Sequence, residues 1–293
     1  MQSHAWVSVR ARTLTDGTRR SFIEKLHSHQ ALVMRATTET APAWASPWGL
    51  QGAVAARLVA GAAGPVGGDG WRWDIDVGSD AAFLLGAAGG TLVLPGPRGE
   101  TSSSVVNVRV AGGGTLIWEP GVQIAAAGCR HQGFIHVMLE QGARLYLRDD
   151  VVLGRHAEEP GDYRQRLRIT VAGRAIYDQT LAVGDAAPGW ASGAVMGGYR
   201  TLGSLVVIDP EQTLIRRGGA AVSDAIPHTA VMPLDELGIV ISSVDHTLVD
   251  LLRKLDRAFA HCREPRPSAA ASIRPYLVPD PARTRRTPGA QLI

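Results

Sequence analysis

The chain has 293 residues, 45% of them apolar, which is enough for one large domain or two ordinary domains. Its formal charge is +3, and its two cysteines, Cys129 and Cys262, are too few for a disulfide framework. No segment is long and apolar enough for a convincing membrane span, and the first residues lack the apolar core of a secretion signal. We therefore expect a soluble, cytoplasmic protein.

The middle of the chain repeats a pattern of an alternating strand, a glycine turn and a second strand. The four copies read WRWDIDVGSDAAFLL, VVNVRVAGGGTLIWE, IHVMLEQGARLYLRD and LRITVAGRAIYDQTL. Their turn glycines, Gly78, Gly112, Gly142 and Gly173, lie 34, 30 and 31 residues apart. Glycine supplies the positive φ of a tight turn, so the pattern predicts stacked β-hairpins. They would form a β-sandwich or a β-solenoid-like body.

The alternation also predicts which side chains of these strands point into the core. The inward positions are Ile75, Val77, Val108, Val110, Val137, Leu139, Ile169 and Val171.

Helix signals are few in this mainly β chain. The segment SSVDHTLVDLLRKLDRAFAHC predicts the main helix at residues 244–262, with Ser243 or Asp245 as its N-cap. A second, weaker helix is expected at QGAVAARLVA, residues 51–60, or at residues 209–213. From Arg263 onward the chain is rich in Pro, Ala and Arg, which indicates a flexible basic tail. We expect a β-rich domain over 1–262 and a tail over 263–293.

One candidate metal site lies in CRHQGFIH, which contains Cys129, His131 and His136. A thiolate and two imidazoles suit nickel or zinc. Their spacing matches no standard site, and packed or solvated histidines explain the same pattern. Metal binding by these three residues therefore stays open.

Carboxylates gather near the ends of several expected strands. They are Asp74, Asp76, Glu119, Asp149, Asp150, Glu158 and Glu159. The last four lie in LYLRDDVVLGRHAEE together with Arg155, whose planar guanidinium can clamp a carboxylate. Such groups can do acid–base chemistry or bind a cation weakly. Solvated faces and a salt-bridged corner are the competing explanations.

Four segments, in this order and spacing, resemble the UreD family of urease accessory proteins, also called UreH. They are PVGGDGWRWDIDVGSDAAFLL, GGGTLIWEPGVQI, GARLYLRDDVVLGR and YRQRLRITVAGRAIYDQTL. The resemblance covers about residues 55–181 and returns in the strand and helix near the C-terminus. Its most specific marks are GGD, which ends at Asp69, and LGR, which ends at Arg155. It implies a β-rich scaffold with two helices and no catalytic activity.

The resemblance also implies partners. These are a UreF-like accessory protein, through it a UreG-like GTPase, and apo-urease, into which the assembly inserts nickel. Nickel would be in transit, with no cofactor bound permanently. Successive weak ligands suit such transit, and the expected passage residues are Glu119, Asp149, Asp150, Asp74 and Asp76. The residues expected in partner contacts or in structural roles are Asp69, Arg155, Glu158 and Glu159.

Two other classes of function remain open. A β-solenoid enzyme acting on polysaccharide is the first, although 5% aromatic content is low for stacking on sugars. A basic-tailed interaction module is the second, but the body lacks the basic, aromatic stripe of a nucleic-acid binder. We expect neither nucleic acid nor a membrane as partner. We expect instead an apolar docking surface that includes Trp44, Trp48 and Trp190 from loops rich in Gly and Pro.

Overall fold

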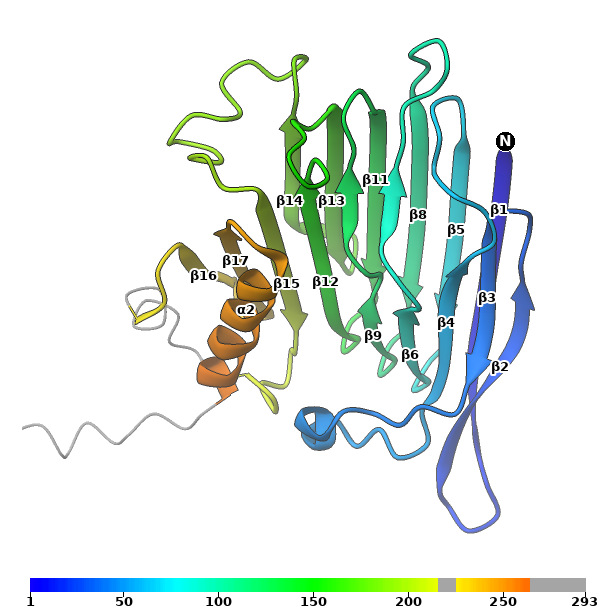
Figure 1. Cartoon of the computed structure of the whole chain (residues 1–293). Helices are drawn as coiled ribbons and strands as arrows, with labels where there is room; N and C mark the ends of the chain where they lie inside the picture. The colour runs from blue at the N-terminus through cyan, green and yellow to red at the C-terminus, as the bar shows by residue number, and fades with distance from the viewer. Residues whose placement is uncertain (216–224, 264–293) are drawn as a thin grey trace, which may run out of the picture. The chain divides into compact units, whose positions relative to one another are not determined.

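The alternating segments fold into two facing β-sheets, with a helix on the outer face of one of them (Figure 1). The computed structural model describes residues 1–215 and 225–263. Residues 1–263 form one unit, and the tail expected from residue 263 lies, apart from Arg263 itself, outside the described residues. In the described part of the chain, no helix is long and apolar enough to span a membrane.

The smaller sheet has seven strands in the spatial order β14-β13-β11-β8-β5-β1-β2. They are β1 (Gln2–Thr13), β2 (Arg19–His27), β5 (Gly70–Val77), β8 (Ser102–Val110), β11 (Arg130–Leu139), β13 (Asp162–Val171) and β14 (Arg174–Val183). The larger sheet follows the order β16-β17-β15-β12-β9-β6-β4-β3, with β10 joining β7 to β12. Its strands are β3 (Leu32–Thr37), β4 (Val54–Ala60), β6 (Ala82–Ala87), β7 (Thr91–Val93), β9 (Thr115–Glu119), β10 (Gln123–Ala125), β12 (Arg144–Leu153), β15 (Thr201–Ile208), β16 (Thr229–Leu234) and β17 (Gly238–Asp245).

The body is β-solenoid-like, which is one of the two predicted architectures. The predicted hairpins, however, are present in only one of the four repeats. Their paired segments lie in different sheets, as β5 and β6, β8 and β9, and β11 and β12. Each link turns the chain from one sheet to the facing sheet. Each strand then pairs in parallel with its counterpart in the neighbouring repeat. The fourth repeat, β13 and β14, is an antiparallel hairpin.

The positive φ predicted for the four turn glycines is found in two of them. Gly142 and Gly173 have positive φ, 78° and 81°. In the first two repeats the left-handed residues are instead Asp80, with φ 56°, and Gly113, with φ 70°. All three links that cross between the sheets have their left-handed residue at the same place, the third position after the strand, which is Asp80, Gly113 and Gly142 in turn.

Parallel pairing places equivalent residues of successive repeats side by side. The rows in register are Ile75–Val108–Val137–Ile169 and Val77–Val110–Leu139–Val171. All eight side chains are buried in the main core between the two sheets, which confirms the predicted inward face. Side chains of the larger sheet, such as Leu145 and Leu147, complete this core from the other side.

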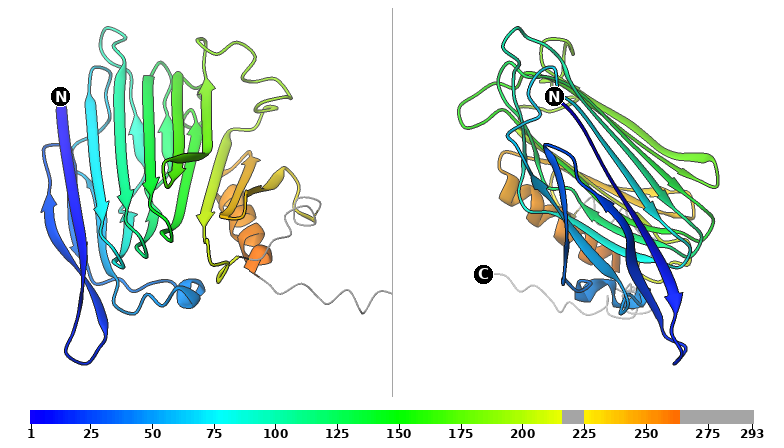
Figure 2. Two further views of the ribbon diagram at one scale, coloured as in Figure 1. Left: turned by 180° about the vertical axis from the view of Figure 1, so that it is seen from behind. Right: turned by 90° about the vertical axis from the view of Figure 1, so that its right-hand side faces the viewer.

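A second core covers the outer face of the larger sheet. Helix α2 (Leu248–Arg263) packs Leu251, Leu255 and Phe259 there, and the 3-10 helix η1 (Ala43–Trp48) adjoins it (Figure 2). Trp48, expected on a docking surface, is buried in this core and donates its Nε1–H to Asp209 at 3.1 Å. The other two loop tryptophans, Trp44 and Trp190, are half-buried against the second core and a third cluster. Trp48 is therefore excluded from the expected docking surface, and docking through Trp44 or Trp190 stays a prediction.

The main helix lies near the C-terminus as predicted, but it begins at Leu248. The hydroxyl of Thr247 accepts the N–H of Asp250 at 3.1 Å and caps the helix, in place of Ser243 or Asp245. The two weaker helix predictions were wrong. Residues 54–60 form β4 between β3 and β6, and residues 209–213 form a turn around the carboxylate of Asp209.

The two-sheet core makes Leu145→Ala strongly destabilising. The side chain is fully buried, so the substitution removes apolar contacts and leaves a cavity that costs about 2–5 kcal/mol. Val249→Ala is the control, because Val249 is 56% exposed on α2 and should change stability by no more than about 0.5 kcal/mol. Urea unfolding measures both. Equal effects would contradict a core between the sheets.

Candidate functional site

The inward rows of the smaller sheet change from apolar to polar toward the beginnings of its strands. One row in register is Trp71–Ser104–Gly133–Gln165, and the next is Ser102–His131–Tyr163. Ser102, His131 and Gln165 are among the buried polar residues of the chain. The stacking that aligns apolar rows in the core therefore also aligns polar side chains at one end of it.

His131 is held on both sides by serine hydroxyls. Its Nδ1 lies 2.9 Å from Ser102 Oγ, and its Nε2 lies 3.1 Å from Ser104 Oγ. The ring stacks on Tyr163, with 5.6 Å between the ring centroids. Burial lowers the pKa of His131 to about 4, so the imidazole is neutral at physiological pH. A neutral imidazole can bind a metal ion once one serine contact is exchanged.

Asp149 approaches the same place from the facing sheet. It lies on β12 opposite Ser204, and its Oδ1 accepts a hydrogen bond from Gln165 Nε2 at 3.2 Å. Burial, and to a smaller extent the neighbouring charge of Asp150, raises the pKa of Asp149 to about 6. At pH 7 the carboxylate is therefore mostly ionised. In residues 1–215 and 225–263, no basic side chain forms an ion pair with it.

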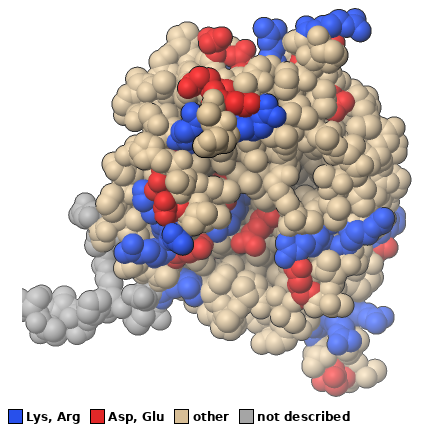
Figure 3. Space-filling view, viewed as in Figure 1, with Lys and Arg blue, Asp and Glu red and all other residues tan. Residues whose placement is uncertain are grey.

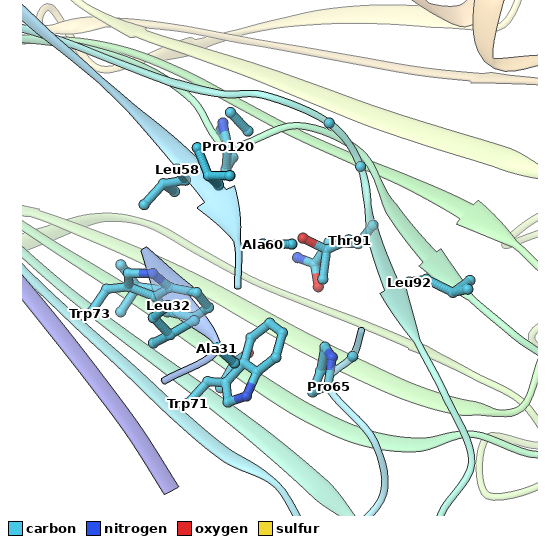
Figure 4. Close-up of a pocket in the computed structure, with 18 of the residues that line it drawn as sticks. Ala31, Leu32, Leu58, Ala60, Pro65, Trp71, Trp73, Thr91, Leu92 and Pro120 are labelled. Carbon is cyan, nitrogen blue, oxygen red and sulfur yellow. The ribbon is translucent and has the colours of Figure 1, made fainter. Parts of the chain in front are cut away.

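Two chambers lie between the sheets at this cluster. The larger, about 220 Å³, is lined by Ser104, His131 and Gln165 and also by exposed loop residues such as Ala62 and Gly89. Figure 4 shows other residues of its lining, among them Trp71, Trp73 and Pro65. The smaller, about 20 Å³, is lined by Asp149 and Gln165, with the exposed Gln179 among its other residues. Gln165 lines both chambers. We call Ser104, His131, Asp149 and Gln165 the polar junction.

Asp149 and Asp150 point to opposite faces of β12. Asp150 lies on the outer face near α2, 3.4 Å from Arg148, which also pairs with Asp256 of α2 at 3.0 Å. Burial raises the pKa of Asp150 to about 6, and Arg148 opposes this shift. Glu119 is exposed at the end of β9 on the same outer face, where acidic and basic side chains lie interspersed (Figure 3).

Asp74 and Asp76 lie on the outer face of the smaller sheet. Asp74 accepts hydrogen bonds from Asn107 at 2.8 Å and from Arg72 at 2.9 Å, and Asp76 pairs with Arg10 at 2.6 Å. The strand alternation that buries Ile75 and Val77 turns both acids away from the chambers. Of the five acids expected to line one passage, Asp149 is the one that lines a chamber.

The residues expected in partner contacts or structural roles lie apart from the junction. Asp69 is buried, and its Oδ2 accepts the N–H of Val66 at 3.0 Å in the turn before β5. Arg155 pairs with Glu158 within one loop, and this contact lowers the pKa of Glu158 to about 2. Glu159 lies 3.9 Å from Arg200. Partner contacts of these residues stay a prediction.

The three residues of CRHQGFIH do not converge. His131 points between the sheets, whereas His136 lies on the opposite face of β11. Cys129 is buried, and burial raises the pKa of its thiol to about 11, which keeps it protonated. Within the described ranges, no three His, Cys, Asp or Glu side chains are placed to hold a metal ion together.

Ser104 and Gln165 were missed in the sequence, although a signal was present. Gln165 has the same strand parity as Ile169 and Val171, and Ser104 has the same parity as Val108. A polar side chain at an inward position marks a polar site between sheets. Both side chains are neutral and belong to no known motif, so only their strand parity marks them.

The ionisation of Asp149 predicts the pH dependence of stability. Its folded pKa, about 6, lies above its usual value of 3.8, so between these values the folded state keeps a proton that the unfolded state has lost. The free energy of unfolding therefore falls as pH rises through this window, and the penalty is complete above pH 6. Asp149→Asn removes it and should stabilise the chain at pH 7.5 by at most about 3 kcal/mol.

Urea unfolding at pH 7.5 and at pH 3.5 measures this effect. The advantage of Asp149→Asn should largely disappear at the lower pH, where the carboxyl is protonated in the folded state and mostly protonated in the unfolded state. A variant that is less stable than the parent at pH 7.5 would contradict a partly buried carboxylate without a basic partner.

Comparison with known proteins places these features in a family. A family model described as UreD urease accessory protein matches residues 4–288. The urease accessory protein UreD of Streptomyces avermitilis is 38% identical over 205 residues, 69% of this chain and 80% of that protein. That of Streptomyces coelicolor is 35% identical over 204 residues, 69% and 79% of the two chains. Urease accessory protein UreD 1 of Saccharopolyspora erythraea is 28% identical over 257 residues, 88% and 94%.

Proposed function

This chain belongs to the UreD family of urease accessory proteins, and we propose that in urease maturation it is a non-catalytic scaffold that carries a nickel passage. The passage runs between the two sheets, from the larger chamber through the polar junction to the smaller one. The single observation that carries this proposal is the ionised, unpaired carboxylate of Asp149 where the two chambers share Gln165.

The charge of Asp149 supplies the attraction for a cation. A carboxylate in a partly buried, apolar setting is poorly solvated, which is why its pKa is raised. A divalent cation beside it compensates the charge and lowers that pKa again. The pKa of Asp150 is raised as well, but Arg148 at 3.4 Å already supplies a positive charge beside it.

The ligands of the junction suit transit of nickel. Carboxylate and amide oxygens bind nickel weakly, and the neutral imidazole of His131 adds one nitrogen. Conduction needs sites that are favourable enough to enter and weak enough to leave. A deep, tetrahedral cage of thiolates and imidazoles would instead hold the ion.

The non-catalytic part of the proposal rests on the same groups. A general base near neutral pH needs a pKa close to 7, and His131 has a pKa of about 4. Its two nitrogens also face serine hydroxyls, with no carboxylate to orient the ring as in a hydrolase triad. The family favours an accessory role over a polysaccharide-active enzyme.

A passage with two ends needs a donor at one and a recipient at the other. We propose a UreF-like protein and, through it, a UreG-like GTPase on the donor side, and apo-urease on the recipient side. Exposed residues line each chamber, Ala62 and Gly89 in the larger and Gln179 in the smaller. Nickel is then cargo, with no cofactor bound permanently.

Asp149→Asn tests this function because it separates delivery from folding. The variant keeps the size of the side chain and removes the charge, so the accessory complex should assemble as before. Nickel per urease active site, measured after co-expression at limiting nickel, should fall about tenfold, which corresponds to one lost interaction of about 1.4 kcal/mol.

The control for this experiment is Asp76→Asn, the same chemical change on the outer face of the smaller sheet. It should leave nickel loading at the parent level. Full loading in Asp149→Asn, with recovery of the complex unchanged, would refute a passage through the junction.

A further inference from the structure

We propose that Gln165 is a cation-operated gate between the two chambers, an inference that rests on the proposed passage. Gln165 lines both chambers and is 4% exposed, so its side chain occupies the space where the chambers meet. Any ion that moves from one chamber to the other must displace this side chain.

Two features place the Gln165 amide in its closed position: one long hydrogen bond to Asp149, and the space left free because Gly133 has no side chain. Gln165 Nε2 donates to Asp149 Oδ1 at 3.2 Å. Gln165 Oε1 lies in the space that a Cβ on Gly133 would fill, 1.9 Å from that position. Gly133 is the register partner of Gln165 on the neighbouring strand, so the glycine provides the recess for the amide.

The amide in this position is only half satisfied. Oε1 is buried and finds no hydrogen-bond donor among the described residues, whereas Nε2 has its partner in Asp149. A buried acceptor without a donor raises the free energy of the closed state. The closed state is therefore one that a suitable ligand for Oε1 can readily displace.

A cation is such a ligand. When it reaches Asp149, its charge competes with the Nε2–H for the carboxylate and repels that donor. Rotation of the amide then withdraws Nε2, turns Oε1 toward the cation and vacates the recess over Gly133. Asp149 exchanges a hydrogen bond for a cation, and Oε1 gains the partner that it lacks. Such side-chain rotations need no movement of the sheets.

This arrangement makes the gate selective by charge. A neutral molecule lacks the charge to displace the Nε2–H from the Asp149 carboxylate, and an anion is repelled by that carboxylate, so the amide stays in place. The carbonyl oxygen also adds a second weak ligand at the moment of passage. Gln165 thus acts both as the barrier and as a transient ligand of the ion.

The experiment uses the full chain in its accessory complex and measures the initial rate of nickel incorporation into apo-urease. Gln165→Leu keeps a side chain of similar size but has no oxygen to offer, so it should lower the rate at least about tenfold. Gln165→Ala removes the barrier together with the oxygen, so its rate should lie clearly above that of Gln165→Leu. Gln132→Leu is the matched control, because Gln132 is exposed on the same face as His136, away from the chambers.

Gly133→Ala gives a second test that leaves Gln165 intact. The new methyl group takes the recess and forces the amide out of its closed position, so the rate should stay at or above the parent rate. If Gln165→Leu lowers recovery of the complex, the rate measured for Gly133→Ala tests the gate in its place. A tenfold loss of rate in Gly133→Ala would overturn the gate.

The outcomes separate the gate from the passage. Slow loading in Asp149→Asn with parent rates in Gln165→Leu overturns the gate and retains the passage. Equal losses in Gln165→Leu and Gln165→Ala also overturn it, because they make Gln165 a required ligand without a barrier. Parent rates in all variants, Asp149→Asn included, refute the proposed passage itself.

Discussion

Parallel, in-register stacking of successive repeats is the constraint on which the rest of the structure depends. Each of the first three repeats gives one strand to each sheet, and β13 of the fourth continues the smaller sheet, so a given inward position recurs in the same row from β5 to β13. A row such as Ile75–Val108–Val137–Ile169 forms a continuous apolar stripe. Where the inward residues change from apolar to polar along one strand, they change at the same level on the neighbouring strands. The space between the sheets is therefore divided into apolar and polar layers, each formed by one or more rows.

The candidate site is one such polar layer. The rows that contain Gln165 and His131 are polar, and Gly133 leaves room between their side chains. Asp149 meets them from the facing sheet, where its neighbours Leu145 and Leu147 belong to the apolar core. A single carboxylate at the boundary of an apolar core is poorly solvated and lacks a basic partner, and this gives the junction its attraction for a cation.

Strand alternation makes both the inward core and the inward polar positions predictable from the sequence. If Ile75 and Val77 point inward, Asp74 must point outward, and Gln165 must point inward with Ile169. The sheet-to-sheet links were not predictable in this way, because a strand, a glycine turn and a strand describe a hairpin equally well. What separates the two is the partner of each strand, which is a long-range property. The chambers likewise arise from contacts between distant repeats.

The most direct test of the central claim is anomalous X-ray diffraction at the nickel absorption edge, on crystals of the chain exposed to Ni²⁺ above pH 7. Asp149 is ionised there, so the account predicts an anomalous peak between Asp149 and Gln165, with the amide oxygen turned toward it. Asp149→Asn crystals should lack this peak. Nickel bound at surface histidines such as His4 or His246, with none between the sheets, would contradict the account.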